Sequence, residues 1–114
     1  METEAFLDTG CSQSVVGGEF GELLLSKLGD PVQIGRISTR LGNFDGEVHR
    51  IDLGLSADGG SSLAISATVM VTDEQPWPFP PMVLGYTNAL ERVRFALDPG
   101  LTTDSGRFYF GNLK

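Results

Sequence analysis

The sequence predicts a mainly β protein, built as a small closed barrel or a sandwich with one or two short helices. Apolar and polar residues alternate over much of the chain, which is the period of a half-buried strand. Segments rich in glycine, aspartate and asparagine separate the alternating runs, as turns do. A chain of 114 residues can form one hydrophobic core and is too short for two lobes. We therefore expect residues 1–114 to form a single domain.

The first elements of the chain are a short strand and a helix. Residues 5–7 are apolar and form a strand that leads into an Asp-Thr-Gly tripeptide. A helix of about ten residues is expected next, because apolar residues recur at helical spacing before Gly29 and Pro31. These residues are Phe20, Leu23, Leu24 and Leu28, and their stripe is most simply core packing.

Reversals of the chain follow. The alternating runs at 51–55 and 63–71 form a hairpin, because residues 58–61 between them include the glycines that a tight turn needs. A second reversal is predicted at residues 43–46, between strands at 37–41 and 47–50, and a third at residues 99–106. Asp52 is followed by leucine and is predicted to face solvent from its strand.

Residues 75–81 contain four prolines, which remove the backbone donors that a central strand requires. A rigid loop is the expected structure. Trp77 and Phe79 within it either cover the edge of the core or line a substrate groove.

Charge and composition exclude several classes of function. Fifteen acidic and eight basic residues give a net charge of −7, and the basic residues are scattered, so no nucleic-acid partner is expected. The lone cysteine and the lone histidine do not suit a zinc site, and no cofactor is predicted. One cysteine forms no internal disulfide, and the sequence shows neither the pattern of a signal peptide nor an apolar run of membrane-spanning length. This pattern favours a cytoplasmic or otherwise intracellular protein.

The tripeptide after the first strand carries the chemistry. Water can be activated without a metal by a carboxylate at a fixed position, and Asp8 at the end of a strand is such a group. Thr9 can brace the loop, and Gly10 lets the backbone come close. Ordinary residue frequencies place such a tripeptide after two apolar residues in roughly one chain in a hundred of this length. A second match is therefore needed.

That match lies near the C-terminus. Residues 82–85 read Met-Val-Leu-Gly, residues 87–92 favour a short helix, residues 93–98 form a strand, and residues 107–111 are an aromatic strand. With the Asp-Thr-Gly strand, this order resembles the retropepsins, the single-lobe aspartic proteases of retroviral type. The resemblance implies a small closed barrel of the retropepsin type, in which residues 83–85 pass beneath the active-site loop and residues 87–92 support it.

The resemblance implies an aspartic endopeptidase that is active as a homodimer, because each chain supplies one catalytic aspartate. The catalytic residues would be Asp8, Thr9 and Gly10, and the two Asp8 carboxylates would share one proton. The substrate would be an extended polypeptide bound as an added strand. The substrate-binding residues implied are Ser12, Leu41, Gly42, Asn43, Phe44, Gly46, Leu84 and Gly85.

Residues 41–46 lie where this family carries its flap, a hairpin that closes over the substrate. The alternative is an ordinary hairpin tip. The family also has one or two strands before its catalytic strand, whereas only Glu2, Thr3 and Glu4 separate Met1 from that strand here. The rival function is therefore a non-catalytic peptide-binding or dimerisation module with the same fold. A cysteine nucleophile is a further alternative, with Cys11 paired to the only histidine, His49.

Overall fold

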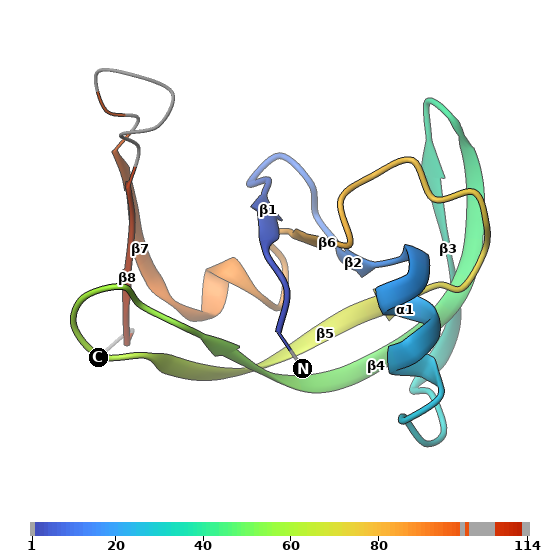
Figure 1. Ribbon diagram of the computed structural model, residues 1–114, viewed down its shortest axis with the longest axis horizontal. Helices are drawn as coiled ribbons and strands as arrows, with labels where there is room; N and C mark the ends of the chain where they lie inside the picture. The colour runs from blue at the N-terminus through green and yellow to red at the C-terminus, as the bar shows by residue number, and fades with distance from the viewer. Residues whose placement is uncertain (1, 99, 101–106, 113–114) are drawn as a thin grey trace.

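A computed structural model describes residues 2–98, 100 and 107–112 (Figure 1). Within them the chain forms eight strands, one α-helix and one 3-10 turn. The strands are β1 (Ala5–Leu7), β2 (Ser14–Val16), β3 (Gln33–Thr39), β4 (Gly42–Leu55), β5 (Leu63–Val71), β6 (Met82–Leu84), β7 (Arg94–Asp98) and β8 (Arg107–Gly111). The helix α1 is Gly18–Leu25, and the 3-10 turn η1 is Leu90–Arg92. The protein is mainly β, as predicted.

The strands form an open sheet. Six of them lie in the order β1-β6-β2-β5-β4-β3, and β7 and β8 form a separate antiparallel pair. In the described part of the chain β1 and β3 are the two ends of the large sheet, so the predicted closed barrel is not found. The physical reason is the shortness of β1, whose three residues pair with β6 alone. The opposite edge, β3, lies far from β1 across the strongly curved sheet (Figure 1).

The central hairpin is β4 and β5, and it confirms the predicted turn at residues 58–61. The two strands pair antiparallel from Glu47 opposite Val71 to Leu55 opposite Leu63. Their side chains alternate as expected, and Asp52 is exposed. Most of the main core lies on one face of this hairpin, where Ala67, Val69 and Val71 are fully buried.

The second reversal was predicted at the wrong place. The chain turns at residues 40 and 41, since Thr39 pairs with Gly42 across the β3–β4 hairpin. Residues 43–46, the predicted turn, belong to β4. Gly42 has a φ of 128°, which only glycine adopts easily, and the hydroxyl of Thr39 donates to the Gly42 carbonyl oxygen at 2.8 Å. These two residues move the turn toward the N-terminus. The third predicted reversal lies outside the described residues except for Gly100.

Helix α1 confirms the predicted helix and covers one end of the core. Phe20 and Leu24 pack against the main cluster, whereas Leu23 is half exposed, contrary to its assignment to the core stripe. The helix approaches the sheet closely at Gly21, where an added Cβ would overlap the carbonyl oxygen of Thr72. No helix in the described part of the chain is long and apolar enough to cross a membrane.

The proline-rich loop between β5 and β6 covers a second, smaller core cluster. Trp77 packs against this cluster, which consists of Val15, Val48 and Met70. Its indole N–H donates to the Pro80 carbonyl oxygen at 3.0 Å. Of the two roles considered for Trp77, the packing shows the structural one.

Candidate functional site

The Asp8 loop begins where β1 ends. The Asp8 backbone N–H donates to the Leu84 carbonyl oxygen at 3.0 Å, which continues the pairing of β1 with β6. The Gly10 N–H donates to Asp8 Oδ1 at 3.0 Å, and the Cys11 N–H donates to the Asp8 carbonyl oxygen at 3.1 Å. Asp8 is half-buried, while Thr9 and Gly10 are exposed. The carboxylate is thus held at the surface by its own loop.

The rest of the loop is held by the segment that follows β6. Strand β6 lies between β1 and β2, so the chain on both sides of the loop is paired with it. Beyond β6, the Tyr86 N–H donates to the Cys11 carbonyl oxygen at 2.9 Å, and the Thr87 N–H donates to the Ser12 carbonyl oxygen at 3.1 Å. The segment therefore passes beside the loop and fixes it at several points.

Gly85 is at the point of closest approach. A Cβ added there would lie 2.6 Å from the Gln13 carbonyl oxygen and 2.7 Å from that of Cys11. Both contacts are with backbone, which has little room to move. The Gly85 N–H donates to the buried Ser14 hydroxyl at 2.9 Å, and its carbonyl oxygen accepts from Leu90 at 3.2 Å. Glycine is required here by space.

The structure brings six of the expected site residues together: Asp8, Thr9, Gly10, Ser12, Leu84 and Gly85. Leu84 contributes through its backbone, because its side chain is 1% exposed and packs in the main core. Of the short helix predicted at residues 87–92, the structure forms only the three-residue 3-10 turn η1 (Leu90–Arg92). The tip of the loop, at residues 9, 10 and 12, faces solvent.

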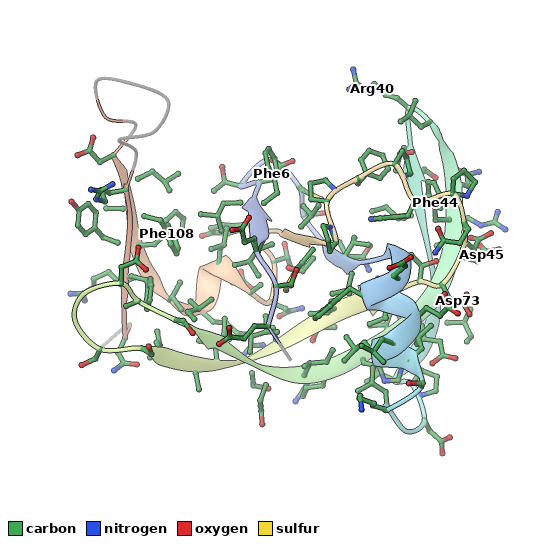
Figure 2. All side chains as sticks on the ribbon, in the orientation of Figure 1. Phe6, Arg40, Phe44, Asp45, Asp73 and Phe108 are labelled. Atoms are coloured by element: carbon green, nitrogen blue, oxygen red, sulfur yellow. The ribbon has the colours of Figure 1, made fainter. Side chains whose placement is uncertain are left out.

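The residues of the candidate flap have different positions in the β3–β4 hairpin. Leu41 is in the turn of the β3–β4 hairpin and is 66% exposed, and Gly42 and Asn43 follow it at the start of β4. Figure 2 shows the neighbouring Arg40 at the far end of this hairpin, extending away from the sheet. The hairpin and the Asp8 loop rise on the same side of the sheet, with the proline-rich loop between them (Figure 1). A hairpin is thus present where the flap was predicted, but its tip is at residues 40 and 41.

Phe44 and Gly46 are part of the base of that hairpin. The Phe44 ring is buried and lies edge-on to Trp77 and Phe79, with ring centroids 4.9 and 6.2 Å apart. Gly46 leaves room for the Val71 carbonyl oxygen, which an added Cβ would overlap. Gly46 therefore has a packing role. The hairpin is therefore attached to the proline-rich loop by aromatic contacts.

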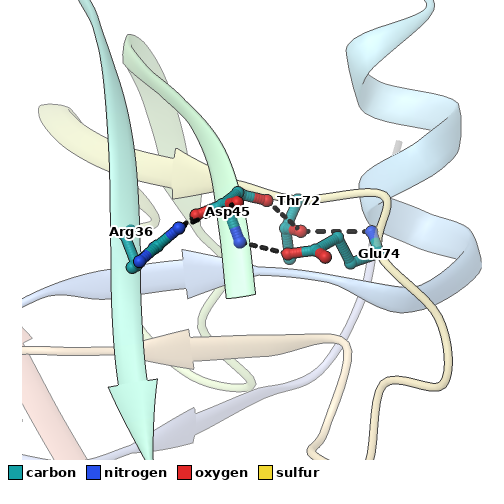
Figure 3. A network of polar contacts seen from close by, with 4 residues as sticks. All are labelled: Arg36, Asp45, Thr72 and Glu74. Atoms are coloured by element: carbon teal, nitrogen blue, oxygen red, sulfur yellow. Dashed lines mark hydrogen bonds and ion pairs between the residues drawn. The ribbon is translucent and has the colours of Figure 1, made fainter. Parts of the chain in front are cut away.

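A polar network secures the same base (Figure 3). Arg36 on β3 forms an ion pair with Asp45 on β4, with Nε 2.6 Å from Oδ1. The Thr72 hydroxyl donates to the Asp45 carbonyl oxygen at 2.7 Å, and the Asp45 N–H donates to the Glu74 carboxylate. The hydrogen bond from Arg36, with its positive charge, lowers the pKa of Asp45.

Replacing Asp45 with asparagine is expected to lower the melting temperature slightly at neutral pH. Because the pKa of Asp45 is lowered in the folded state, its stabilisation is present above the carboxyl's ordinary pKa and is lost as the pH falls through the lowered value. The difference between the variant and the wild type should therefore vanish in acid and shrink in high salt. Asp73→Asn is the control, since Asp73 is exposed and has no ion pair within the described residues. A difference that persisted in acid would contradict this origin.

The alternative nucleophile, Cys11, is not supported by a base. Its thiol donates to the Gln13 carbonyl oxygen at 3.0 Å. His49 is buried in the middle of β4, where its Nε2 lies 2.9 Å from Glu47 Oε1. Each group is thus engaged in its own local contact.

Sequence reasoning missed Ser14 and Tyr86. Ser14 is fully buried and accepts the Gly85 N–H, and the Tyr86 backbone bonds the loop. A serine directly before two valines, in a strand that was not predicted, was the available signal for Ser14. Tyr86 acts through backbone atoms and so left no signal in the sequence.

In comparisons with protein families, curated proteins and solved structures, nothing matches this chain.

Proposed function

We propose that this protein is an aspartic endopeptidase of retropepsin type whose active site forms between two copies of the chain. The observation that carries the proposal is the Asp8 loop, held by backbone hydrogen bonds to Leu84 on one side and to Tyr86 and Thr87 on the other. A catalytic carboxylate needs this kind of fixed, pre-organised position. The structure has the strand, the Asp-Thr-Gly loop, the Leu-Gly segment and a 3-10 turn in the order that the sequence predicted. Their arrangement supports the proposal.

The second copy is required by the chemistry. One chain has one such loop, and hydrolysis by this route takes two carboxylates that share a proton. The exposed backbone of Thr9 and Gly10 leaves the loop free to meet its twin across a two-fold axis. The Thr9 hydroxyls would brace the two loops against each other.

In the paired site, the ionised Asp8 accepts a proton from water as the water oxygen attacks the peptide carbonyl carbon, and the protonated Asp8 donates to the carbonyl oxygen. The tetrahedral intermediate then collapses and the C–N bond breaks. The leaving nitrogen takes the proton that one Asp8 accepted from water, and a hydroxyl of the intermediate returns a proton to the other Asp8, so the pair again holds one proton. No covalent bond to the enzyme forms. The Gly10 N–H keeps the reacting carboxylate oriented through Oδ1.

The β3–β4 hairpin would cover the bound substrate, with Leu41 at its tip and Gly42 as the flexible position. Its base is fixed by Phe44 and by the Arg36–Asp45 pair. Movement would then be confined to the tip of the hairpin. The substrate would lie between this tip and the Asp8 loop as an extended strand.

Cleavage of an unfolded test protein is the direct test. We expect cleavage on the acidic side of neutrality, with a bell-shaped pH profile because the pair must hold one proton. A statine-type peptide should inhibit it, while thiol reagents and chelators should not. Specific activity should rise with protein concentration in the dilute range, in step with dimer formation measured by analytical ultracentrifugation. Constant specific activity in a monomer would rule out the shared site, and absence of cleavage by a confirmed dimer would favour the non-catalytic module.

A further inference from the structure

A trough of about 760 Å³ lies beside β1 and does not include Asp8, Thr9 or Gly10. Its lining includes residues 2–5 and Leu7 on the β1 side, and Phe108 and Phe110 of β8. Its floor is the far end of β4. The apolar residues that line it include Phe20, Ile51, Leu53, Leu55, Phe108 and Phe110. In Figure 2 the Phe108 side chain lies on the side of β8 that faces β1.

The trough is a place where the core is incomplete. Along the core face of the β4–β5 hairpin, Val69 and Val71 have no exposed surface, and Ala67 has 1%. The residues farther along the same face are only partly buried, although they are as apolar. These are Ile51, Leu53, Leu55, Leu63 and Ile65. A contiguous apolar surface of this kind is typical of a binding site.

The wall formed by β1 has free backbone groups. In the described residues β1 pairs only with β6. The Asp8 N–H points to β6, where it donates to Leu84. Because backbone groups alternate along a strand, the N–H and C=O groups of Ala5 and Leu7 point away from β6. This edge can accept another strand.

The charge of the lining selects the occupant. Its only charged residues are Glu2, Glu4 and Asp52, which are exposed and make no ion pair within the described part of the chain. Asp52 points away from the core face that carries Ile51 and Leu53, whereas Glu2 and Glu4 directly precede β1. An added strand with basic residues between its apolar ones would pair with Glu2 and Glu4. A second copy is disfavoured at this edge, since its own β1 would bring Glu2 and Glu4 to face the same carboxylates.

We propose that the trough and the free edge of β1 bind an extended segment of another polypeptide, in which apolar residues alternate with lysine or arginine. The apolar side chains enter the trough, the backbone pairs with β1, and the basic side chains meet Glu2 and Glu4 at the rim. This inference goes beyond the proposed function and does not depend on the chemistry of Asp8. It would give the strand that ends in Asp8 a second neighbour.

The test uses two fluorescein-labelled peptides, one with valine alternating with lysine and one with valine alternating with glutamate. Fluorescence anisotropy at neutral pH should show binding of the lysine peptide at least roughly tenfold tighter than that of the glutamate peptide. The Glu2→Lys/Glu4→Lys variant should reverse this preference. Glu22→Lys/Asp30→Lys, an equal change in net charge at exposed residues outside the lining, should keep it.

Two further measurements separate this site from the others. Methylating alternate backbone nitrogens on one edge of the peptide should abolish binding, while methylating the other edge should leave it, because only one edge pairs with β1. A statine-type peptide should not compete, and Asp8→Asn should bind as the wild type does, whether or not the protein is a protease.

Several outcomes would overturn the proposal. These are no binding of the lysine peptide, equal binding of the two peptides, or a preference that the rim variant leaves unchanged. Competition by the statine-type peptide would place the peptide at the Asp8 site instead. Sedimentation showing a dimer of the wild-type chain that the rim variant cannot form would make the trough an interface between copies.

Discussion

Replacing Asp8 with asparagine should abolish peptide hydrolysis and leave the fold unchanged. The change is nearly isosteric, and the amide oxygen of asparagine can still accept the Gly10 N–H that Asp8 Oδ1 accepts. What is lost is the group that takes and returns the proton, a contribution of about 10²–10⁴ in rate. Turnover of a quenched fluorescent peptide near the acidic optimum measures the loss, and circular dichroism and urea unfolding check the fold.

The chain provides a matched control for this variant. Asp52 is followed by leucine and Gly54, so it is also an aspartate two residues before a glycine, but it is exposed on β4. Asp52→Asn should keep full activity. Excess Asp8→Asn protein added to the wild type should lower activity more than dilution does, because mixed dimers contain one carboxylate. Undiminished activity in Asp8→Asn, or equal losses in both variants, would remove the assignment.

Replacing Gly85 with alanine should destabilise the fold and displace the Asp8 loop. The added methyl group would lie 2.6 Å from the Gln13 carbonyl oxygen and 2.7 Å from that of Cys11, so the loop or β6 must move. Overpacking of this kind costs about 1–3 kcal/mol of the free energy of unfolding, which urea titration measures. Any activity that depends on the loop should fall by much more than the loss of folded protein explains.

Gly54→Ala is the control for this second change. Gly54 also follows a leucine at the end of a β run, yet an added Cβ there meets nothing within 4 Å. Its free energy of unfolding should stay within about 1 kcal/mol of the wild type, with any change toward greater stability. If the two alanine variants behaved alike, the close packing of the Leu84–Gly85 segment under the loop would not be the reason for the glycine.

Local sequence patterns predicted those elements whose structure depends on residues close together in the chain. Alternation and the turn glycines predicted the β4–β5 hairpin, and helical spacing predicted α1. The β3–β4 turn was misplaced because residues 43–46 contain good turn formers, whereas Gly42 and the Thr39 hydroxyl set the turn earlier. The competing signals were only a few residues apart, and pairing between the strands decided the register.

The sequence alone predicts that the chain is mainly β, that Asp8 follows a strand, and that a Leu-Gly segment occurs far along the chain. The position of this segment between β1 and β2, where it holds the loop, depends on the tertiary structure, since contacts between distant segments leave little trace in either segment alone. The tertiary structure also decided that the sheet stays open. Closure depends on the length and pairing of the edge strands, and β1, with three residues, pairs with β6 and leaves a trough beside it.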